Sequence, residues 1–171
     1  MIVAKDKVTL HGKPVQLIGT PVKTGDRAAD FTVLDQDLKP VTRAILAGKP
    51  CILSSVVSLD TPVCDVQMRR FNEEATRIGK DVQIIVVSMD LPFAQKRWCG
   101  AAGASNVHAF SDHRDASFGK AYGLLIKDLR LLARAVFVVD AQGVIRYREI
   151  VPEITHEPDY QAALRALGEL T

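Results

Sequence analysis

The fold is decided by the stretch CILSSVVSLDTPVC, residues 51–64, which joins a predicted strand to a predicted helix. Residues 51–57 form a mainly apolar run, and a Gly-Lys-Pro sequence at 48–50 introduces it. Such a run is typical of a strand that is buried on both faces of a sheet. The short loop of residues 58–60 then leads into the helix, so the stretch predicts a strand-loop-helix unit.

The start of this helix can be assigned residue by residue. Thr61 suits the N-cap, because its hydroxyl can accept a hydrogen bond from an unpaired amide of the first turn. Pro62 then occupies the first helical position, where its missing N–H costs nothing and its fixed φ already suits a helix. Cys64 is therefore expected in the first turn, near the positive end of the helix dipole and close to unpaired amides. Both features favour a thiolate over a thiol.

One apolar stripe runs along the same helix, which is expected to end near Gly79. Its members recur at helical spacing, and they are Cys64, Met68, Phe71, Ala75 and Ile78. Cys64 is therefore predicted to be the first-turn member of the buried face. The alternative is an inert core cysteine, because free cysteine is among the most buried residue types. The threonine before the helix and a second helical cysteine favour the activated thiol.

The second helical cysteine is Cys99, at the end of the segment LPFAQKRWC, residues 91–99. Lys96 and Arg97 lie beside it and would favour its thiolate, although such charges equally suit a solvated helix face. An activated cysteine with a second cysteine that can trap its oxidised form is the minimum equipment for reducing a peroxide.

Further apolar runs and turn residues extend the prediction to the whole chain. We expect a hairpin over residues 8–17 with its turn at 11–13, followed by an extended loop at 18–30. Further strands are expected at 31–34, 82–88, 135–139 and 144–151. The Cys99 helix should be closed by Gly100 or Gly103, another helix is expected at 115–122, and Pro158 should open a terminal helix. Apolar strands that alternate with helices imply a sheet covered on both faces. The last two strands share a short turn, so they pair antiparallel and the sheet is mixed. The chain is predicted to be one α/β domain, residues 1–171, with an N-terminal β-hairpin.

The composition is that of an ordinary globular protein, with 171 residues, of which 47% are hydrophobic and 25% are charged. The net charge of +2 and the lack of a long run of like charges do not point to nucleic acid or to an anionic membrane surface. No apolar stretch approaches the roughly 18 residues of a membrane span. The charged N-terminus lacks the apolar region of a signal peptide, so we expect a cytoplasmic protein.

Three cysteines in a reducing compartment argue for thiol chemistry rather than for a disulfide framework. Cys51 opens the apolar strand and is expected only to pack in the core. No Gly-rich phosphate loop follows a strand and no Cys-x-x-Cys motif is present, so no cofactor and no thioredoxin-type redox motif are expected. The histidines lack the spacing of a metal site and are expected at the surface; they are His11, His108, His113 and His156.

Arg134 stands between two apolar stretches, directly before the strand at 135–139. A guanidinium in so apolar a context needs an anionic or strongly polar partner, because burying it alone is prohibitive. The Cys64 thiolate is one candidate partner. The other is an ordinary buried pair with one of the 20 carboxylates of the chain.

The chain resembles a known family, the bacterial thiol peroxidases, which are atypical two-cysteine peroxiredoxins on a thioredoxin-like fold. The likeness covers almost the whole length, from the hairpin at Val8 to EITHEPDY at 153–160. Its most specific parts are DTPVC at 60–64, DLPFAQ at 90–95 together with Cys99, and LARAV at 132–136.

This resemblance implies a role for each candidate residue. Cys64 would be the peroxidatic cysteine, and Cys99 would resolve its sulfenic acid by forming an intramolecular disulfide. Thr61 would hydrogen-bond the thiolate and the peroxide, and Arg134 would stabilise both. The resemblance further implies that hydrogen peroxide and organic hydroperoxides are substrates, that the protein is a homodimer, and that thioredoxin is its reductant.

One position departs from the family's pattern. The active-site motif of the family begins with a proline, and this chain has Val57 there. A rival interpretation follows from that departure, in which the cysteine pair serves a peroxide sensor or redox-binding protein with slow turnover.

Overall fold

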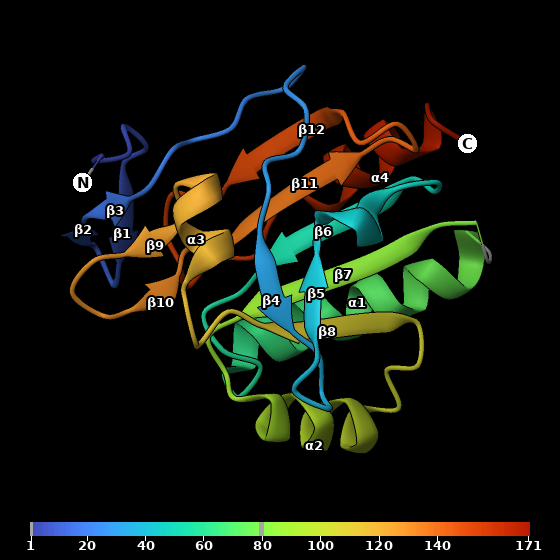
Figure 1. The fold of residues 1–171 in the computed structure, drawn as a ribbon, viewed down its shortest axis with the longest axis horizontal. Helices are drawn as coiled ribbons and strands as arrows, with labels where there is room; N and C mark the ends of the chain where they lie inside the picture. Colours follow the sequence, from blue (N-terminus) through green and yellow to red (C-terminus); the bar gives the residue numbers. More distant parts are fainter. Residues whose placement is uncertain (1, 79–80) are drawn as a thin grey trace.

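A seven-stranded mixed sheet forms the centre of the computed structural model, which describes residues 2–78 and 81–171 (Figure 1). From one edge to the other, the strands are β12 (Ile145–Ile150), β11 (Ala135–Val139), β6 (Cys51–Ser55), β7 (Gln83–Ser88), β8 (Val107–Ser111), β4 (Thr32–Leu34) and β5 (Pro40–Thr42). Strands β6, β7 and β8 pair in parallel, whereas β11 pairs antiparallel with both β6 and β12. The predicted mixed sheet is confirmed.

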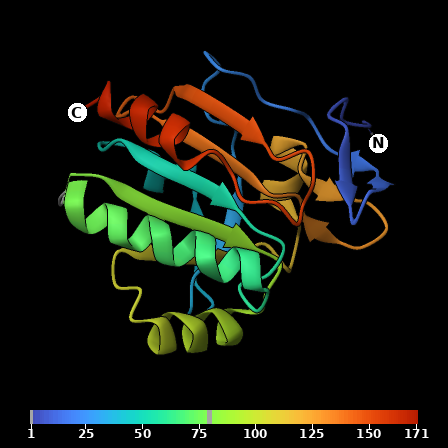
Figure 2. The same ribbon diagram turned by 180° about the vertical axis from the view of Figure 1, so that it is seen from behind.

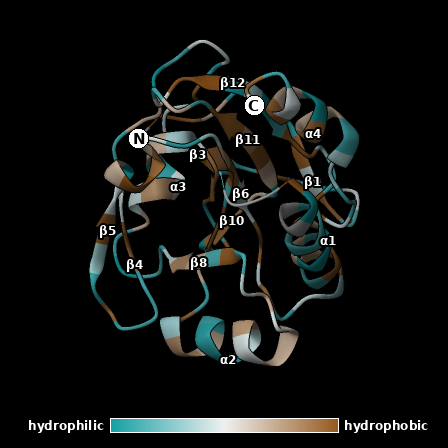
Figure 3. Cartoon of the chain, turned by 90° about the vertical axis from the view of Figure 1, so that its right-hand side faces the viewer, coloured by the Kyte–Doolittle hydropathy of each residue, from teal (hydrophilic) through white to brown (hydrophobic). Residues whose placement is uncertain are grey.

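Helices cover both faces of this sheet, as predicted. The helices α1 (Pro62–Ile78) and α4 (Tyr160–Gly168) lie on one face, as Figure 2 shows, and α2 (Pro92–Ala102) packs beside β8. The opposite face carries α3 (Ser117–Tyr122) and the short 3₁₀ helix η1 (Arg43–Leu46) (Figure 1). In Figure 3 the strands β6 and β11 carry the hydrophobic colour at the centre of the molecule.

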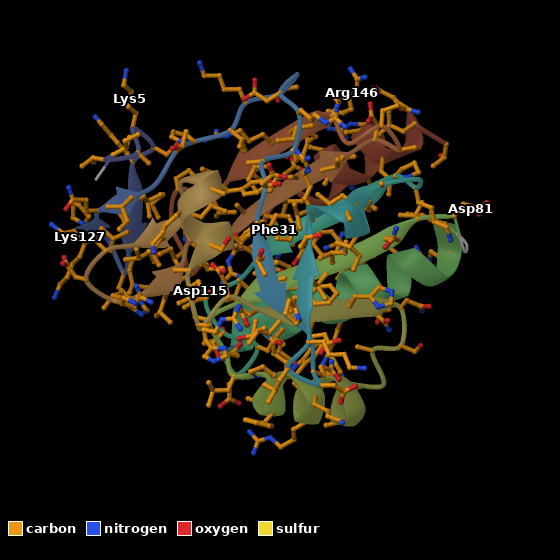
Figure 4. The ribbon with its side chains drawn as sticks, viewed as in Figure 1. Lys5, Phe31, Asp81, Asp115, Lys127 and Arg146 are labelled. Atoms are coloured by element: carbon orange, nitrogen blue, oxygen red, sulfur yellow. The ribbon has the colours of Figure 1, made fainter. Side chains whose placement is uncertain are left out.

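The two faces of the sheet build two separate apolar cores because side chains alternate along a strand. In β6, Ile52 packs with the α1 and α4 side, while Cys51 and Leu53 pack with the α3 side. Phe31 lies over the α3 side (Figure 4). Its ring packs edge-on against that of Phe118, with 5.4 Å between the two ring centroids.

The N-terminal hairpin is confirmed and consists of β1 (Val8–Leu10) and β2 (Lys13–Val15). His11 and Gly12 form its turn with φ values of 50° and 76°, the positive values that a tight two-residue hairpin turn requires. Lys13 was predicted to lie in the turn, but it is the first residue of β2. Nearby, β3 (Leu17–Ile18), β9 (Leu125–Ile126) and β10 (Leu131–Leu132) form a small three-stranded sheet.

Two strands of the central sheet were not predicted, namely β5 and β8. The sequence of β8 is VHAFS, in which the exposed His108 and the polar Ser111 interrupt the apolar run. Its parallel main-chain pairing with β7 makes it a strand, and this pairing is a long-range contact. Strand β6 ends at Ser55, two residues earlier than predicted, although the amide of Val56 still bonds the carbonyl of Val87 at 3.1 Å.

The predicted helices are present with shifted ends. Gly103, in the left-handed conformation, closes α2, and Asp159 caps α4 by accepting a hydrogen bond from the amide of Ala162 at 2.9 Å. Asp159, rather than the expected Pro158, is therefore the residue that begins α4 as its N-cap. On α1, Met68 and Phe71 are buried as predicted, but Ile78, the last residue of the helix, is 36% exposed. The predictions for the Ala75 side chain and for Gly79 fall outside the described residues.

Candidate active site

Cys64 lies in the first turn of α1, as Thr61 and Pro62 predicted. The helix begins at Pro62, and the amide of Asp65 donates to the carbonyl of Thr61 at 3.0 Å. The Cys64 side chain is fully buried in the apolar cluster beneath α1, together with Met68 and Phe71, and its thiol is not in a disulfide. This position places the thiol near the positive end of the α1 helix dipole.

The Thr61 hydroxyl does not act as the predicted cap. It donates a hydrogen bond to the carbonyl of Ser58 at 2.8 Å, and the amide of Thr61 bonds the same carbonyl at 3.2 Å. The hydroxyl proton is therefore used in a hydrogen bond within the tight turn that precedes the helix. The oxygen keeps its lone pairs, so it can accept a hydrogen bond from a ligand beside the helix.

The loop before α1 is anchored by Asp90, a residue whose role was not predicted. Its carboxylate accepts hydrogen bonds from the Ser58 hydroxyl at 2.6 Å, from the amide of Leu59 at 2.8 Å and from the Ser88 hydroxyl at 2.7 Å. Charge-assisted bonds of this kind are stronger than neutral ones. Asp90 therefore ties the start of the Cys64 helix to the end of β7.

Arg134 is 2% exposed, and its hydrogen-bond partners are neutral oxygen atoms. Its Nε donates to the carbonyl of Ile154 at 2.9 Å, and its Nη1 donates to Oε1 of Gln67 at 2.7 Å. No ion pair joins Arg134 to a carboxylate among the described residues, so the alternative of a buried carboxylate pair is wrong. The guanidinium is held by two oriented oxygens that leave its charge uncompensated, which favours an anion beside it.

Gln67 is a site residue that the sequence analysis missed. It is buried on α1, and its Nε2 donates to the Ser54 hydroxyl at 2.7 Å, which in turn donates to the carbonyl of Ala135 at 3.1 Å. This relay fixes the amide so that its oxygen points at Arg134. A polar side chain one turn after Cys64 on a buried helix face was the signal that could have revealed it.

A cavity of about 360 Å³ brings Thr61 and Arg134 together. Its walls are mainly apolar and consist of Leu10, His11, Val57, Thr61, Pro62, Val63, Arg134, Ile154 and Thr155. Val63 is the residue before Cys64, so the cavity adjoins the helical turn that carries the buried thiol. Val57 lines the cavity and keeps an apolar side chain at the position of the family's proline.

Cys99 lies apart from this cavity, half-buried on α2. Burial raises the pKa of its thiol, and a hydrogen bond with the Gln36 side chain opposes that rise in part. Lys96 is exposed and faces Asp37 at 3.4 Å, so the alternative of a solvated charged face describes it better than activation of Cys99. Cys51 is fully buried in the core, as predicted, and burial raises its pKa to about 12.

The helices of the two candidate cysteines are joined by their neighbouring residues. Trp98, which precedes Cys99, donates from Nε1 to Oδ1 of Asp65, the residue after Cys64, at 2.8 Å. Arg69 donates to the other oxygen of Asp65 at 2.9 Å. This link holds α2 against α1 in the state with both thiols free.

Of the predicted surface histidines, three are exposed and His113 is partly buried, where its Nδ1 lies 2.9 Å from the Ser111 hydroxyl. Within residues 2–78 and 81–171, no three His, Cys, Asp or Glu side chains gather in a way that would hold a metal ion. None of the helices in the described ranges is both long enough and apolar enough to cross a bilayer.

Comparison with known proteins identifies the class of this fold and site. Residues 23–164 match the Redoxin family model. A thiol peroxidase of Halalkalibacterium halodurans is 54% identical over 159 residues, which cover 93% of this chain and 95% of that protein. A thiol peroxidase of Bacillus subtilis is 52% identical over 164 residues, covering 96% of this chain and 98% of that one. The crystal structure of a peroxiredoxin-like protein from Aquifex aeolicus superposes with a TM-score of 0.89 at 39% identity, covering all of both chains.

The chain belongs to the Redoxin family, whose thioredoxin-like fold it has. Within that family it falls among the bacterial thiol peroxidases, and it is a peroxidase of the peroxiredoxin type. The resemblance stated from the sequence motifs is confirmed.

Proposed function

We propose that the chain reduces hydrogen peroxide and organic hydroperoxides through Cys64. The thiolate attacks one peroxide oxygen, so that a sulfur–oxygen bond forms while the oxygen–oxygen bond breaks. Sulfur is oxidised to sulfenic acid, and the departing oxygen takes up a proton to leave as water or alcohol. Arg134 and the lone pairs of Thr61 orient the peroxide and stabilise charge on the separating oxygens. The observation that carries this proposal is the cavity in which both residues meet beside the first turn of α1.

Cys99 is proposed to resolve the sulfenic acid. Its thiolate attacks the Cys64 sulfur, forms a disulfide and releases the oxygen as water, and thioredoxin then reduces the disulfide with its two thiols. Cysteines in two helices must come within about 7 Å between Cα atoms to bond, so local unwinding is part of the step. Burial holds the Cys99 pKa high in the folded state. Unwinding of α2 would therefore also make this thiol a better nucleophile.

Peroxide-dependent oxidation of thioredoxin tests the whole cycle. A peroxidase consumes many equivalents of peroxide while thioredoxin is oxidised in proportion. The rival interpretation, a peroxide sensor with slow turnover, predicts one oxidation per chain and then a stall. We further propose that the peroxidase acts in the cytoplasm, because its cycle needs the thiols of Cys64 and Cys99 to be reduced again after each turnover. The resemblance to the bacterial thiol peroxidases is the basis for proposing a homodimer.

One equivalent of peroxide is expected to produce a Cys64–Cys99 disulfide within one chain. Non-reducing mass spectrometry should find this bond in the monomer, and a disulfide-linked dimer would contradict it. The only tryptophan of the chain is Trp98. Because the bond from Trp98 to Asp65 must break when α2 unwinds, its fluorescence should change in step with the disulfide. The Cys99→Ser variant is the control that should keep the initial fluorescence after oxidation.

Val57→Pro is expected to raise activity only modestly. Valine already supplies apolar bulk to the cavity wall, and no acceptor for its amide is found among the described residues. Proline would restrict the backbone there, and a compatible change of this kind typically adds about 0.4–1 kcal/mol of stability. The gain in the rate of Cys64 oxidation should stay below about tenfold, or about 1.4 kcal/mol of barrier. Stopped-flow oxidation of both proteins measures it. A gain of several hundredfold would instead favour the sensor.

A further inference from the structure

The cavity beside Cys64 has one wall that comes from the far N-terminal end of the chain. Leu10 and His11 of the hairpin line it, together with Val57 and Pro62. The hairpin reaches this place by pairing with residues 152–154. The amide of Thr9 donates to the carbonyl of Pro152 at 2.8 Å, and the amide of Ile154 donates to the carbonyl of Thr9 at 2.9 Å.

A single carboxylate, that of Glu153, ties these two segments together. Its Oε2 accepts from the Thr9 hydroxyl at 2.5 Å and from the amide of Gly12 at 3.0 Å. Its Oε1 accepts from the amide of His11 at 2.9 Å and from the Thr155 hydroxyl at 2.8 Å. Glu153 therefore binds the tight turn of the hairpin and the next residues of its own loop. These hydrogen bonds, of which the one from Thr9 has the largest effect, hold the pKa of Glu153 far below its usual range. The clamp that they form around the carboxylate therefore stays ionised near neutral pH.

The same loop also orients Arg134. The residue after Glu153 is Ile154, whose carbonyl accepts from Nε of Arg134 at 2.9 Å. The loop is thus fixed on one side by the hairpin, through Glu153, and on the other side by the guanidinium. Movement of the hairpin would shift both the apolar wall of the cavity and one of the two oxygens that hold Arg134.

We propose that Glu153 is a positioning residue that locks the hairpin as a wall of the peroxide cavity and thereby sets its discrimination between large and small hydroperoxides. The inference rests on the proposed role of this cavity in peroxide reduction. Hydrogen peroxide has no apolar group, so beside Cys64 it needs only the polar groups of Thr61 and Arg134. A hydroperoxide with a large apolar group also needs the wall made by Leu10 and His11, since burying its apolar surface there adds binding.

The test compares cumene hydroperoxide with hydrogen peroxide in Glu153→Gln. The second-order rate of Cys64 oxidation is followed by quenched-flow mass spectrometry of the sulfenic acid, in the Cys99→Ser background. A neutral amide offers one acceptor oxygen where the carboxylate offers two, so the clamp loosens. The rate with hydrogen peroxide should fall by a few-fold, because the loop of Glu153 also holds Arg134 through the Ile154 carbonyl. The rate with cumene hydroperoxide should fall further, so that the ratio of the two rates drops by about threefold or more. Glu153→Asp, which keeps the charge, should retain part of that ratio.

Glu157→Gln is the matched control, because Glu157 lies in the same segment and accepts a hydrogen bond from the Tyr160 hydroxyl at 2.8 Å. It should leave the ratio unchanged. An unchanged ratio in folded Glu153→Gln would overturn the inference, since a role in stability alone lowers both rates together. If that variant does not fold, Thr9→Val, which removes one donor of the clamp, decides the question by the same ratio. Failure of wild-type Cys64 to be oxidised would instead reject the proposed function itself.

Discussion

Cys64→Ser is expected to abolish peroxide turnover, whereas Cys99→Ser should still undergo one oxidation to sulfenic acid. The two cysteines differ in their surroundings. Cys64 lies at the start of α1 beside the cavity of Thr61 and Arg134, and Cys99 lies on α2, where burial raises its pKa. A serine hydroxyl at neutral pH is far from ionised and cannot replace a thiolate as the nucleophile. We expect the steady-state rate of Cys64→Ser to fall to that of the uncatalysed reaction.

Cys51→Ser provides the matched control for these variants. Cys51 is buried in the core on the other face of the sheet, and its raised pKa keeps it a neutral thiol. The variant should keep its turnover if it folds. Steady-state peroxide consumption, coupled to thioredoxin oxidation, compares the three variants. Robust turnover by Cys64→Ser would end the assignment of this residue, and a large rate loss in folded Cys51→Ser would show a role for Cys51 beyond packing.

Arg134→Lys is expected to slow the oxidation of Cys64 by about a hundredfold, or about 2.7 kcal/mol of barrier. The guanidinium is held at Nε by Ile154 and at Nη1 by Gln67, and this planar arrangement is what points its charge into the cavity. An ammonium group is a hydrated point charge with no planar fork. It cannot be held by the same two oxygens and present an equally oriented donor to the peroxide.

The rate constant of Cys64 oxidation in stopped flow measures this effect. Arg148→Lys is the control for a general loss of stability, because Arg148 is a partly buried arginine bonded to Asp6 at 2.7 Å, outside the cavity lining. Gln67→Leu should give a smaller loss than Arg134→Lys, since it removes one of the two oxygens that orient the guanidinium. Equal oxidation rates in wild type and Arg134→Lys would mean that Arg134 only fills space in the core.

Several features of the candidate site could be predicted because neighbouring residues determine them. The start of α1 follows from Pro62, whose fixed φ and missing N–H suit the first helical position whatever lies around it. The strand at 135–139 was predicted with its observed ends, since a continuous apolar run has few other ways to be buried. The motifs around Cys64, Cys99 and Arg134 were also sufficient to indicate the family.

The sequence by itself thus determined the helix that carries Cys64, the main buried strands and the class of enzyme, since these depend on local preferences and on motifs. Only the tertiary structure decided what Arg134 binds, because Gln67 and Ile154 lie far from it along the chain and are brought to it by packing. It also decided that the Thr61 proton goes to Ser58, that β8 is a strand and that Glu153 clamps the hairpin. Each of these depends on which of many competing donors and acceptors come within hydrogen-bond distance, and the folded chain alone makes that selection.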